Sequence, residues 1–178
     1  MELNTPRLTM RPIIPADAVA LFETLGDPHV MRFSVAGAHQ SVADTAGWIE
    51  HGIRHQSAHG FAMYAVLRRC DGDIVGQCGL EVLADGRTEI GYRLRRDQWG
   101  RGYAAEAAKA WLDYGFSTLR LSRIVAMIEP GNRRSIRVAE KIGMQAGASE
   151  TFHGIPVIAY FAEAPATPDG ARSAIRTE

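Results

Sequence analysis

The sequence has no excess of charge of either sign, because 20 Lys and Arg residues balance 20 Asp and Glu residues. Without net charge there is no bulk attraction to nucleic acid or to an anionic membrane surface. No apolar run approaches the ~20 residues that span a bilayer, and Met1–Asn4 lacks the basic start and apolar stretch of a secretory signal. We therefore predict a cytoplasmic protein that binds neither nucleic acid nor membrane.

Patterns typical of disulfides and metal sites are also scarce. The two cysteines, Cys70 and Cys78, have no metal-type partner beside them. The spacing of His51, His55 and His59 places them along one helix face, either as metal ligands or as a solvated face. We favour the solvated face, because no carboxylate or cysteine completes a site, and predict no metal.

The chain length of 178 residues suits one domain with a single core. We assign residues 1–163 to that domain. Residues 164–178 are small, polar and proline-containing, and predict a loose C-terminal tail.

The hydrophobic pattern predicts a mixed α/β domain. Two Asp-Gly turns, Asp71-Gly72 and Asp85-Gly86, separate three strand-like runs and indicate an antiparallel meander. The apolar run Ile124–Ile128 is typical of a strand covered on both faces. Predicted helices begin near Pro15, Ser41, Gly102 and Asn132, and predicted strands are Arg7–Arg11, Phe61–Arg68, Ile74–Leu83, Thr88–Leu94, Ile124–Ile128, Gln145–Thr151 and Pro156–Phe161.

The segment Trp99–Glu106 is the most informative, because it follows a strand and opens a helix. Backbone N–H groups in a first helical turn lack intrahelical partners and, with the helix dipole, favour an anion such as phosphate. Gly100 and Gly102 let the backbone approach a pyrophosphate without a Cβ in the way. Three cations surround this turn: Arg95, Arg96 and Arg101. A phosphate site and an ordinary turn with solvated arginines both fit these residues.

The segment Gly100–Ala105 also fits a dinucleotide-binding pattern, with Glu129 near the end of the next strand. Two observations disfavour that nicotinamide-dependent alternative. Five residues separate Leu94 from Gly100, whereas a dinucleotide turn follows its strand directly. The preceding strand also alternates with polar residues, unlike a buried parallel strand.

Four segments together resemble the GNAT superfamily (Gcn5-related N-acetyltransferases), in the branch that includes the ribosomal-protein N-terminal acetyltransferases. The segments are Thr5–Arg11, Glu89–Leu94, Trp99–Glu106, and Asn132–Ser135 running into Glu140–Met144. The family pattern at the turn is Arg or Gln, two residues, Gly, one residue, then Gly or Ala. Gly102 and Ala104 match it, and Trp99, usual in this branch, takes the first position.

The resemblance implies a GNAT fold with acetyl-CoA as co-substrate: a mixed, mostly antiparallel, splayed sheet of about six to seven strands flanked by about four helices. Acetyl-CoA would lie in the gap between Thr88–Leu94 and Arg123–Glu129. Turn amides across Arg101–Ala105 would bind the pyrophosphate, and the Leu94 backbone would pair with the pantetheine arm. The residues so assigned to CoA are Leu94, Trp99, Gly100, Arg101, Gly102, Tyr103, Ala104, Ala105 and Asn132.

The implied reaction moves an acetyl group from acetyl-CoA directly to a primary amine through a ternary complex. The acceptor is a protein N-terminus or a small-molecule amine, and a homodimer is a reasonable default. A non-catalytic acetyl-CoA-binding sensor is the alternative from another class.

Ser135 and Glu89 are the predicted catalytic residues. By family analogy Ser135 donates a hydrogen bond or proton to the departing thiolate, although it also fits as a polar residue of a first helical turn, as Asn132 fits as an N-cap. Glu89 is the candidate general base, directly or through water, and Glu81 is its alternative. Both carboxylates fit equally as partners of nearby arginines. Residues placed near the acceptor by position only are Phe33, Trp48, Tyr92 and His153, with loops Phe33–Gln40 and Gly147–Pro156.

Overall fold

The computed structural model describes residues 1–165, so the predicted tail lies outside the described residues except for Ala164 and Pro165. The strands are β1 (Leu3–Asn4), β2 (Leu8–Pro12), β3 (Met63–Arg68), β4 (Ile74–Val82), β5 (Thr88–Leu94), β6 (Arg123–Ile128), β7 (Gln145–Phe152) and β8 (Ile155–Glu163). The helices are α1 (Ala18–Leu25), α2 (Val42–His59), α3 (Tyr103–Ser117) and α4 (Arg133–Lys141). The predicted order is confirmed, with the two-residue β1 added and with a 3-10 turn, Pro15–Asp17, preceding α1.

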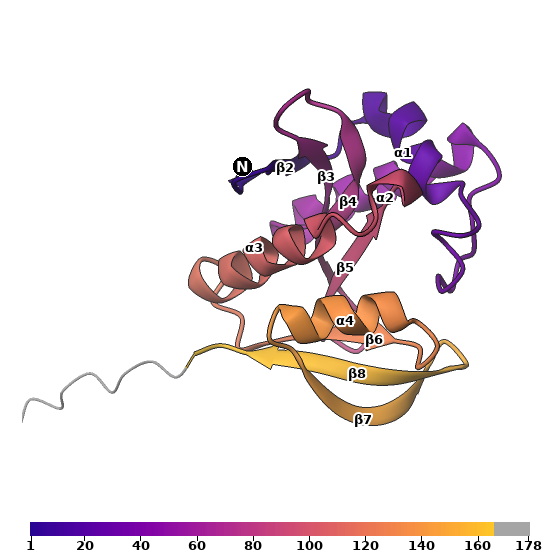
Figure 1. The fold of residues 1–178 in the computed structure, drawn as a ribbon. Coiled ribbons are helices and arrows are strands. Elements are labelled where there is room, and N and C mark those ends of the chain that lie inside the picture. The colour runs from indigo at the N-terminus through magenta and orange to yellow at the C-terminus, as the bar shows by residue number, and fades with distance from the viewer. Residues whose placement is uncertain (166–178) are drawn as a thin grey trace, which may run out of the picture.

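All strands form one sheet in the order β1-β2-β3-β4-β5-β6-β8-β7. Every neighbouring pair is antiparallel except β5 and β6, which run parallel and share the single register pair Glu89 with Val125. The sheet therefore splays beyond that pair. Figure 1 shows the result, with β2–β5 in one half of the molecule and β6–β8 with α4 in the other.

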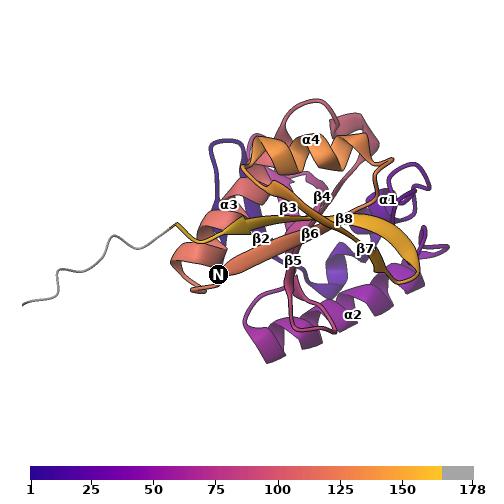
Figure 2. The same cartoon turned by 90° about the horizontal axis from the view of Figure 1, so that it is seen from below.

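Helices cover both faces of this sheet, and Figure 2 shows α4 on one side of the strands and α2 on the other. The larger core packs α3 and α4 on the sheet around Trp111, which is fully buried and meets the Tyr64 ring edge-to-face at 4.8 Å. The smaller core packs α1 and α2 around Leu21 and Ile49. Both faces of the central strands are thus buried, as the near-continuous apolar pattern of β6 requires.

Helix α2 begins and ends as its sequence predicts. Ser41 caps it by accepting from the Asp44 amide at 3.2 Å, and the Asp44 carboxylate accepts in return from the Ser41 amide at 3.0 Å. Gly60 ends it with φ +81°, a conformation that favours glycine.

The histidines of α2 do not form one solvated face. His51 and His59 are exposed, but the His55 ring is partly buried, with Nδ1 2.9 Å from the Phe61 carbonyl and Nε2 accepting from the Val82 amide at 3.0 Å. Both ring nitrogens of His55 are therefore already engaged. Within residues 1–165 no group of three His, Cys, Asp or Glu side chains is placed to hold a metal, and no helix there is long and apolar enough to cross a membrane.

Candidate active site

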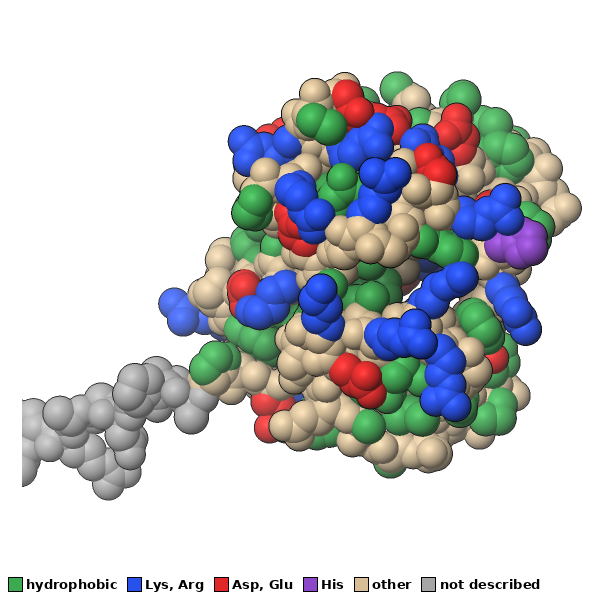
Figure 3. All heavy atoms as spheres, viewed as in Figure 1, with side chains coloured by type: hydrophobic (Ala, Val, Ile, Leu, Met, Phe, Trp, Pro, Cys, Tyr) green, Lys and Arg blue, Asp and Glu red, His purple; other side chains and the backbone are tan. Residues whose placement is uncertain are grey.

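A cleft of about 750 Å³ opens at the splayed part of the sheet. Its walls come from the end of β5, the turn into α3, helix α4 and the loop that follows α1. In Figure 3 the hollow runs between the two halves of the molecule, with Lys and Arg side chains gathered along its rim. Its volume lies within the range of small-molecule and cofactor sites.

The turn into α3 supplies free backbone N–H groups to this cleft. Gly100 and Gly102 have φ +78° and +80°, and Gly102 occupies the N-cap position without a side-chain cap. The first amides of α3 therefore have neither an intrahelical nor a capping acceptor. Gly100, Gly102 and Tyr103–Ala105 all line the cleft, which gives it the anion-binding geometry predicted from the sequence.

Contacts with the N-terminal segment hold this turn in place. The Glu106 carboxylate accepts from the Thr5 hydroxyl at 2.6 Å and from the Arg7 amide at 3.0 Å, and the Arg7 guanidinium also donates to the Arg101 carbonyl at 2.9 Å. Two segments about a hundred residues apart in the chain thus meet at one point. The Arg101 side chain is exposed and does not line the cleft, so only its backbone takes part in the turn.

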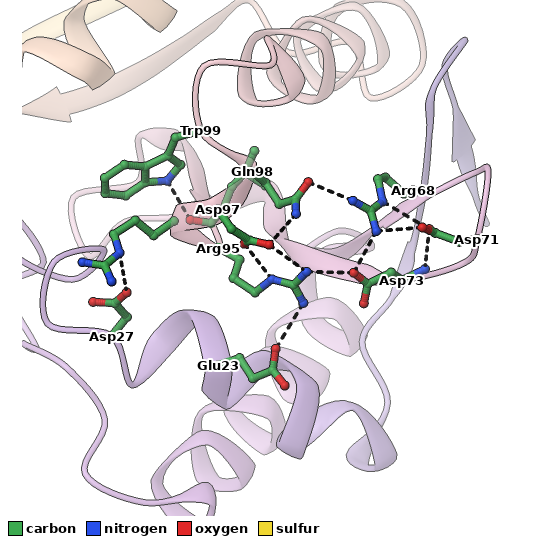
Figure 4. Close-up of polar contacts among 11 residues, drawn as sticks. Glu23, Asp27, Arg68, Asp71, Asp73, Arg95, Asp97, Gln98 and Trp99 are labelled. Atoms are coloured by element: carbon green, nitrogen blue, oxygen red, sulfur yellow. Dashed lines mark hydrogen bonds and ion pairs between the residues drawn. The ribbon is translucent and has the colours of Figure 1, made fainter.

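The expectation that Arg95 and Arg96 offer cations to the turn is wrong. Arg95 donates to the carboxylates of Asp73 at 2.8 Å, Asp97 at 2.8 Å and Glu23 at 3.1 Å, and Arg96 lies 3.6 Å from Asp27. Figure 4 shows the contacts of Arg95 joined to Arg68 through Asp73 and through Asp97 with Gln98, whereas the Asp27 contact stands apart. The network fixes the segment that leads into the turn. Its arginines are already paired with carboxylates and do not point their charge at a ligand.

Four of the six cations of the cleft come instead from α4, which the sequence interpretation missed. Four basic residues of this helix line the cleft, and no Asp or Glu lies among the lining residues of the described chain. The Arg134 guanidinium lies 4.1 Å from the centre of the Trp99 ring and so spans the cleft between its two walls. Spacing along one helix face is the signal that points to these residues: Arg133, Arg134, Arg137 and Lys141.

The backbone amide of Leu94 faces the splayed side of β5. Arg95 donates its amide to Val75 on β4 at 2.8 Å, and amides of successive strand residues point in opposite directions. The Leu94 amide therefore points away from β4, while the Leu94 carbonyl accepts from the Trp99 indole at 2.8 Å. The strand edge beside the cleft therefore offers the Leu94 amide to an extended ligand.

Ser135 and Asn132 lie at the start of α4 on the cleft wall. Asn132 caps the helix, because its side-chain oxygen accepts from the Ser135 amide at 3.2 Å, which confirms the N-cap interpretation. The Tyr92 hydroxyl donates to the Ser135 carbonyl at 3.0 Å and links β5 to α4 across the splay. No hydrogen bond among residues 1–165 engages the Ser135 hydroxyl, which is left to face the cleft.

Glu89 is not among the residues that line the cleft. Its carboxylate accepts from the Met127 amide at 3.0 Å, beside the single register pair that joins β5 to β6. Burial raises the pKa of Glu89 to about 6, against the lowering effect of that hydrogen bond. Glu81 lies directly opposite on β4, in a small separate pocket beneath α2, with an oxygen 3.8 Å from His51 Nε2.

Of the four residues placed near the acceptor from the sequence, two meet at the cleft. Phe33 and Tyr92 both line it, and the Phe33 ring lies against Gly131 before α4. Trp48 lines the small pocket beneath α2 instead, and His153 lies in the turn between β7 and β8. The tertiary fold decides which of the four residues reach the cleft, and local sequence pattern does not show that placement.

Comparison with known proteins agrees with this architecture. A family model described as an acetyltransferase (GNAT) domain matches residues 7–145. The uncharacterized protein YkkB of Bacillus subtilis (strain 168) is 38% identical over 147 residues, covering 80% of this chain and 84% of that protein.

Solved structures give the same result. The acetyltransferase from Agrobacterium tumefaciens str. C58 superposes with a TM-score of 0.79 at 30% identity, over 92% of this chain and 94% of the other. The structure of RimL, described as a ribosomal L7/L12 alpha-N-protein acetyltransferase in complex with coenzyme A, has a TM-score of 0.78 at 17% identity, covering 92% and 98%. At that identity the second likeness shows the shared fold alone.

Proposed function

This chain belongs to the GNAT family of acetyl-CoA-dependent acyltransferases, and we propose that it moves the acetyl group of acetyl-CoA directly to a primary amine within a ternary complex. The observation that carries the donor assignment is the charge of the cleft. Its lining holds the four Lys and Arg side chains of α4 and the free amides of the α3 turn, without a carboxylate among the residues described. A polyanion such as CoA fits that lining.

The strand edge at Leu94 supports the direction in which the donor lies. With its phosphates at Gly100–Ala105, the pantetheine arm would extend along β5 and pair with the Leu94 backbone. An amide at this edge is placed to meet the oxyanion that forms when an amine attacks the thioester, a contact worth ~3–4 kcal/mol in comparable sites. Asn132 and Trp99 complete the proposed CoA contacts.

The chemical step needs two proton transfers. The amine nitrogen forms a bond to the thioester carbon, the carbon–sulfur bond breaks, and CoA leaves as a thiol. We assign the proton of the leaving sulfur to the Ser135 hydroxyl, and the proton of the amine to Glu89 through water, since Glu89 does not line the cleft itself. Bringing donor and amine together contributes up to ~7–11 kcal/mol of the acceleration.

The donor assignment is tested by thermal-shift titration of the protein with acetyl-CoA, CoA and NADPH. A ligand that binds only the native state stabilises it by ~2.7 kcal/mol at a hundredfold excess over its dissociation constant. We expect both CoA forms to raise the melting temperature and NADPH to leave it unchanged. Failure of both CoA forms to do so would refute the donor site.

Turnover is tested separately by release of free thiol from acetyl-CoA in the presence of amines. Release that depends on the amine supports the transferase. Binding of acetyl-CoA without release on any amine of a broad panel would favour the sensor alternative.

A further inference from the structure

Arg93 is one of the residues that line the cleft of the proposed active site. It lies on β5 between Tyr92 and Leu94, so its side chain emerges on the opposite face of the strand from theirs. Tyr92 and Leu94 pack with the core beneath α3 and α4, whereas Arg93 points to the side of the loop after α1 and contacts Ser34 there. All three residues nevertheless line the same cleft, because the sheet is open at this point.

Arg93 has no ion-pair partner among residues 1–165, and the nearest carboxylates that act on its charge, Glu89 and Glu81, do so at longer range. Its side chain makes one recorded hydrogen bond, to Ser34 Oγ at 3.4 Å, and no carboxylate oxygen of residues 1–165 lies within 4.0 Å of it. Gln77, its cross-strand neighbour on β4, is neutral. Every other arginine in the described range is either ion-paired or exposed, but Arg93 is partly buried, and burial lowers its pKa against the opposing effect of Glu89 and Glu81.

Keeping a guanidinium partly buried without an ion-paired anion costs free energy, and an anionic ligand beside it would offset that cost. The donor does not supply it at this place. Its phosphates are assigned to the α3 turn and to α4, on the other face of β5, and the thioester end carries no charge. The amine acceptor is the remaining component of the ternary complex.

We propose that Arg93 binds a carboxylate of the acceptor, so that the substrate is a small amino acid rather than a simple amine, a polyamine or an aminoglycoside. This inference rests on the proposed acetyl transfer. A guanidinium presents paired N–H donors that match a carboxylate. Because Arg93 adjoins the Leu94 amide, the carboxylate lies a few bonds from the reacting nitrogen. The carboxylate itself does not react, because the nitrogen–carbon bond forms and the carbon–sulfur bond breaks as described above.

The test uses matched pairs of amines that differ only by a carboxylate: phenylalanine with phenethylamine, histidine with histamine, and lysine with cadaverine. Wild-type protein is compared with Arg93→Met, Arg93→Lys and the control Arg54→Met, an exposed arginine of α2 that lines neither pocket. Equilibrium binding of each amine is measured without donor, and kcat/KM is measured by thiol release.

We expect wild type and Arg54→Met to prefer at least one carboxylate-bearing member by about tenfold or more in both readouts. Arg93→Met should lose that preference mainly through KM, and Arg93→Lys should recover part of it. Equal binding of both members of every pair, or a preference that survives in Arg93→Met, would overturn the inference. If the protein prefers the carboxylate-bearing amines but does not bind acetyl-CoA, the proposed donor is refuted and the carboxylate site is still supported.

Thermal melting of the variants separates a binding arginine from a structural one. If Arg93 serves to bind a ligand and not to hold the fold, replacing it with Met leaves the melting temperature of the free protein unchanged or raises it. A marked drop in Arg93→Met, absent from Arg54→Met, would instead assign Arg93 to the fold and count against the inference.

Discussion

Ser135 presents to the cleft a hydroxyl that no other group of the described chain engages, while its backbone is held at both ends by Asn132 and Tyr92. Replacement by Ala keeps both backbone contacts and removes only the hydroxyl. We predict that Ser135→Ala lowers kcat by about a hundredfold, the lower end for a proton donor, with the acetyl-CoA dissociation constant unchanged. Single-turnover thiol release together with calorimetric titration measures the two quantities. A normal kcat would reduce Ser135 to a polar residue of the first turn.

Glu89 lies where β5 and β6 meet, and it has a structural role, as acceptor of the Met127 amide, and a proposed catalytic role as the base. As a base it acts only when ionised, so with its pKa raised to about 6 by burial the wild-type rate should rise with pH through that value. Glu89→Gln removes the ionisable group, and we predict that this limb disappears from the profile of kcat against pH. A limb that persists unchanged in the variant would exclude Glu89 from proton transfer.

Stability provides the control for that experiment. A carboxyl whose pKa is raised on folding binds more protons in the native state, so its ionisation lowers stability as the pH rises towards about 6. In Glu89→Gln the amide oxygen can still accept from Met127 and the buried charge is gone. We therefore predict an equal or higher melting temperature at neutral pH, whereas Glu89→Leu, which orphans the Met127 amide, should melt lower.

Two elements contribute to the cleft by different means: the α3 turn through its backbone and α4 through its side chains. We predict that Arg137→Met weakens CoA binding by several-fold, because it removes a cation from the lining. Arg101→Met should leave the affinity unchanged, because the Arg101 side chain is exposed and only its backbone belongs to the turn. Calorimetric titration of CoA into both variants measures the difference. The reverse order of effects would place the phosphates on the turn side chains.

The parts of the site that were predictable from the sequence are those that local geometry determines. Turns and helix caps depend on a few neighbouring residues, and the structure has all three that the sequence predicts: the glycine turn before α3, the Asn132 cap of α4 and the Ser41 cap of α2. The role of Arg95 was not predictable, because its partners Glu23 and Asp73 lie 72 and 22 residues away. Arg93 was missed for the same reason: only the tertiary fold shows that it is partly buried and not ion-paired to a carboxylate of the described chain.

At the scale of the whole molecule, the splayed sheet turns two packed halves into the walls of one site. A continuous ladder between β5 and β6 would close the gap, but these strands share only the pair Glu89 with Val125. The Tyr92 hydroxyl and the Arg134–Trp99 contact cross the opening without filling it. The GNAT resemblance implied this splay, whereas the alternation of residues along β5 showed only a strand.

The charge of the whole chain and the charge of its cleft differ, and this difference has a measurable effect. The net charge is zero, yet six cations and no carboxylate line the cleft of the described chain. Affinity for CoA should therefore fall with ionic strength, although the protein as a whole has no excess charge to screen. The screening length shrinks from about 10 Å at 0.1 M salt to about 3 Å at 1 M, so the attraction between the cleft cations and the donor's phosphates weakens over that range. We predict that the CoA dissociation constant rises by about tenfold over that range, and that its slope against log salt is shallower in Arg137→Met.

Pantetheine is the matched control, since it keeps the arm that is proposed to pair with β5 and lacks the phosphates. A salt dependence equal for CoA and pantetheine would mean that the cations of α4 do not contact the phosphates.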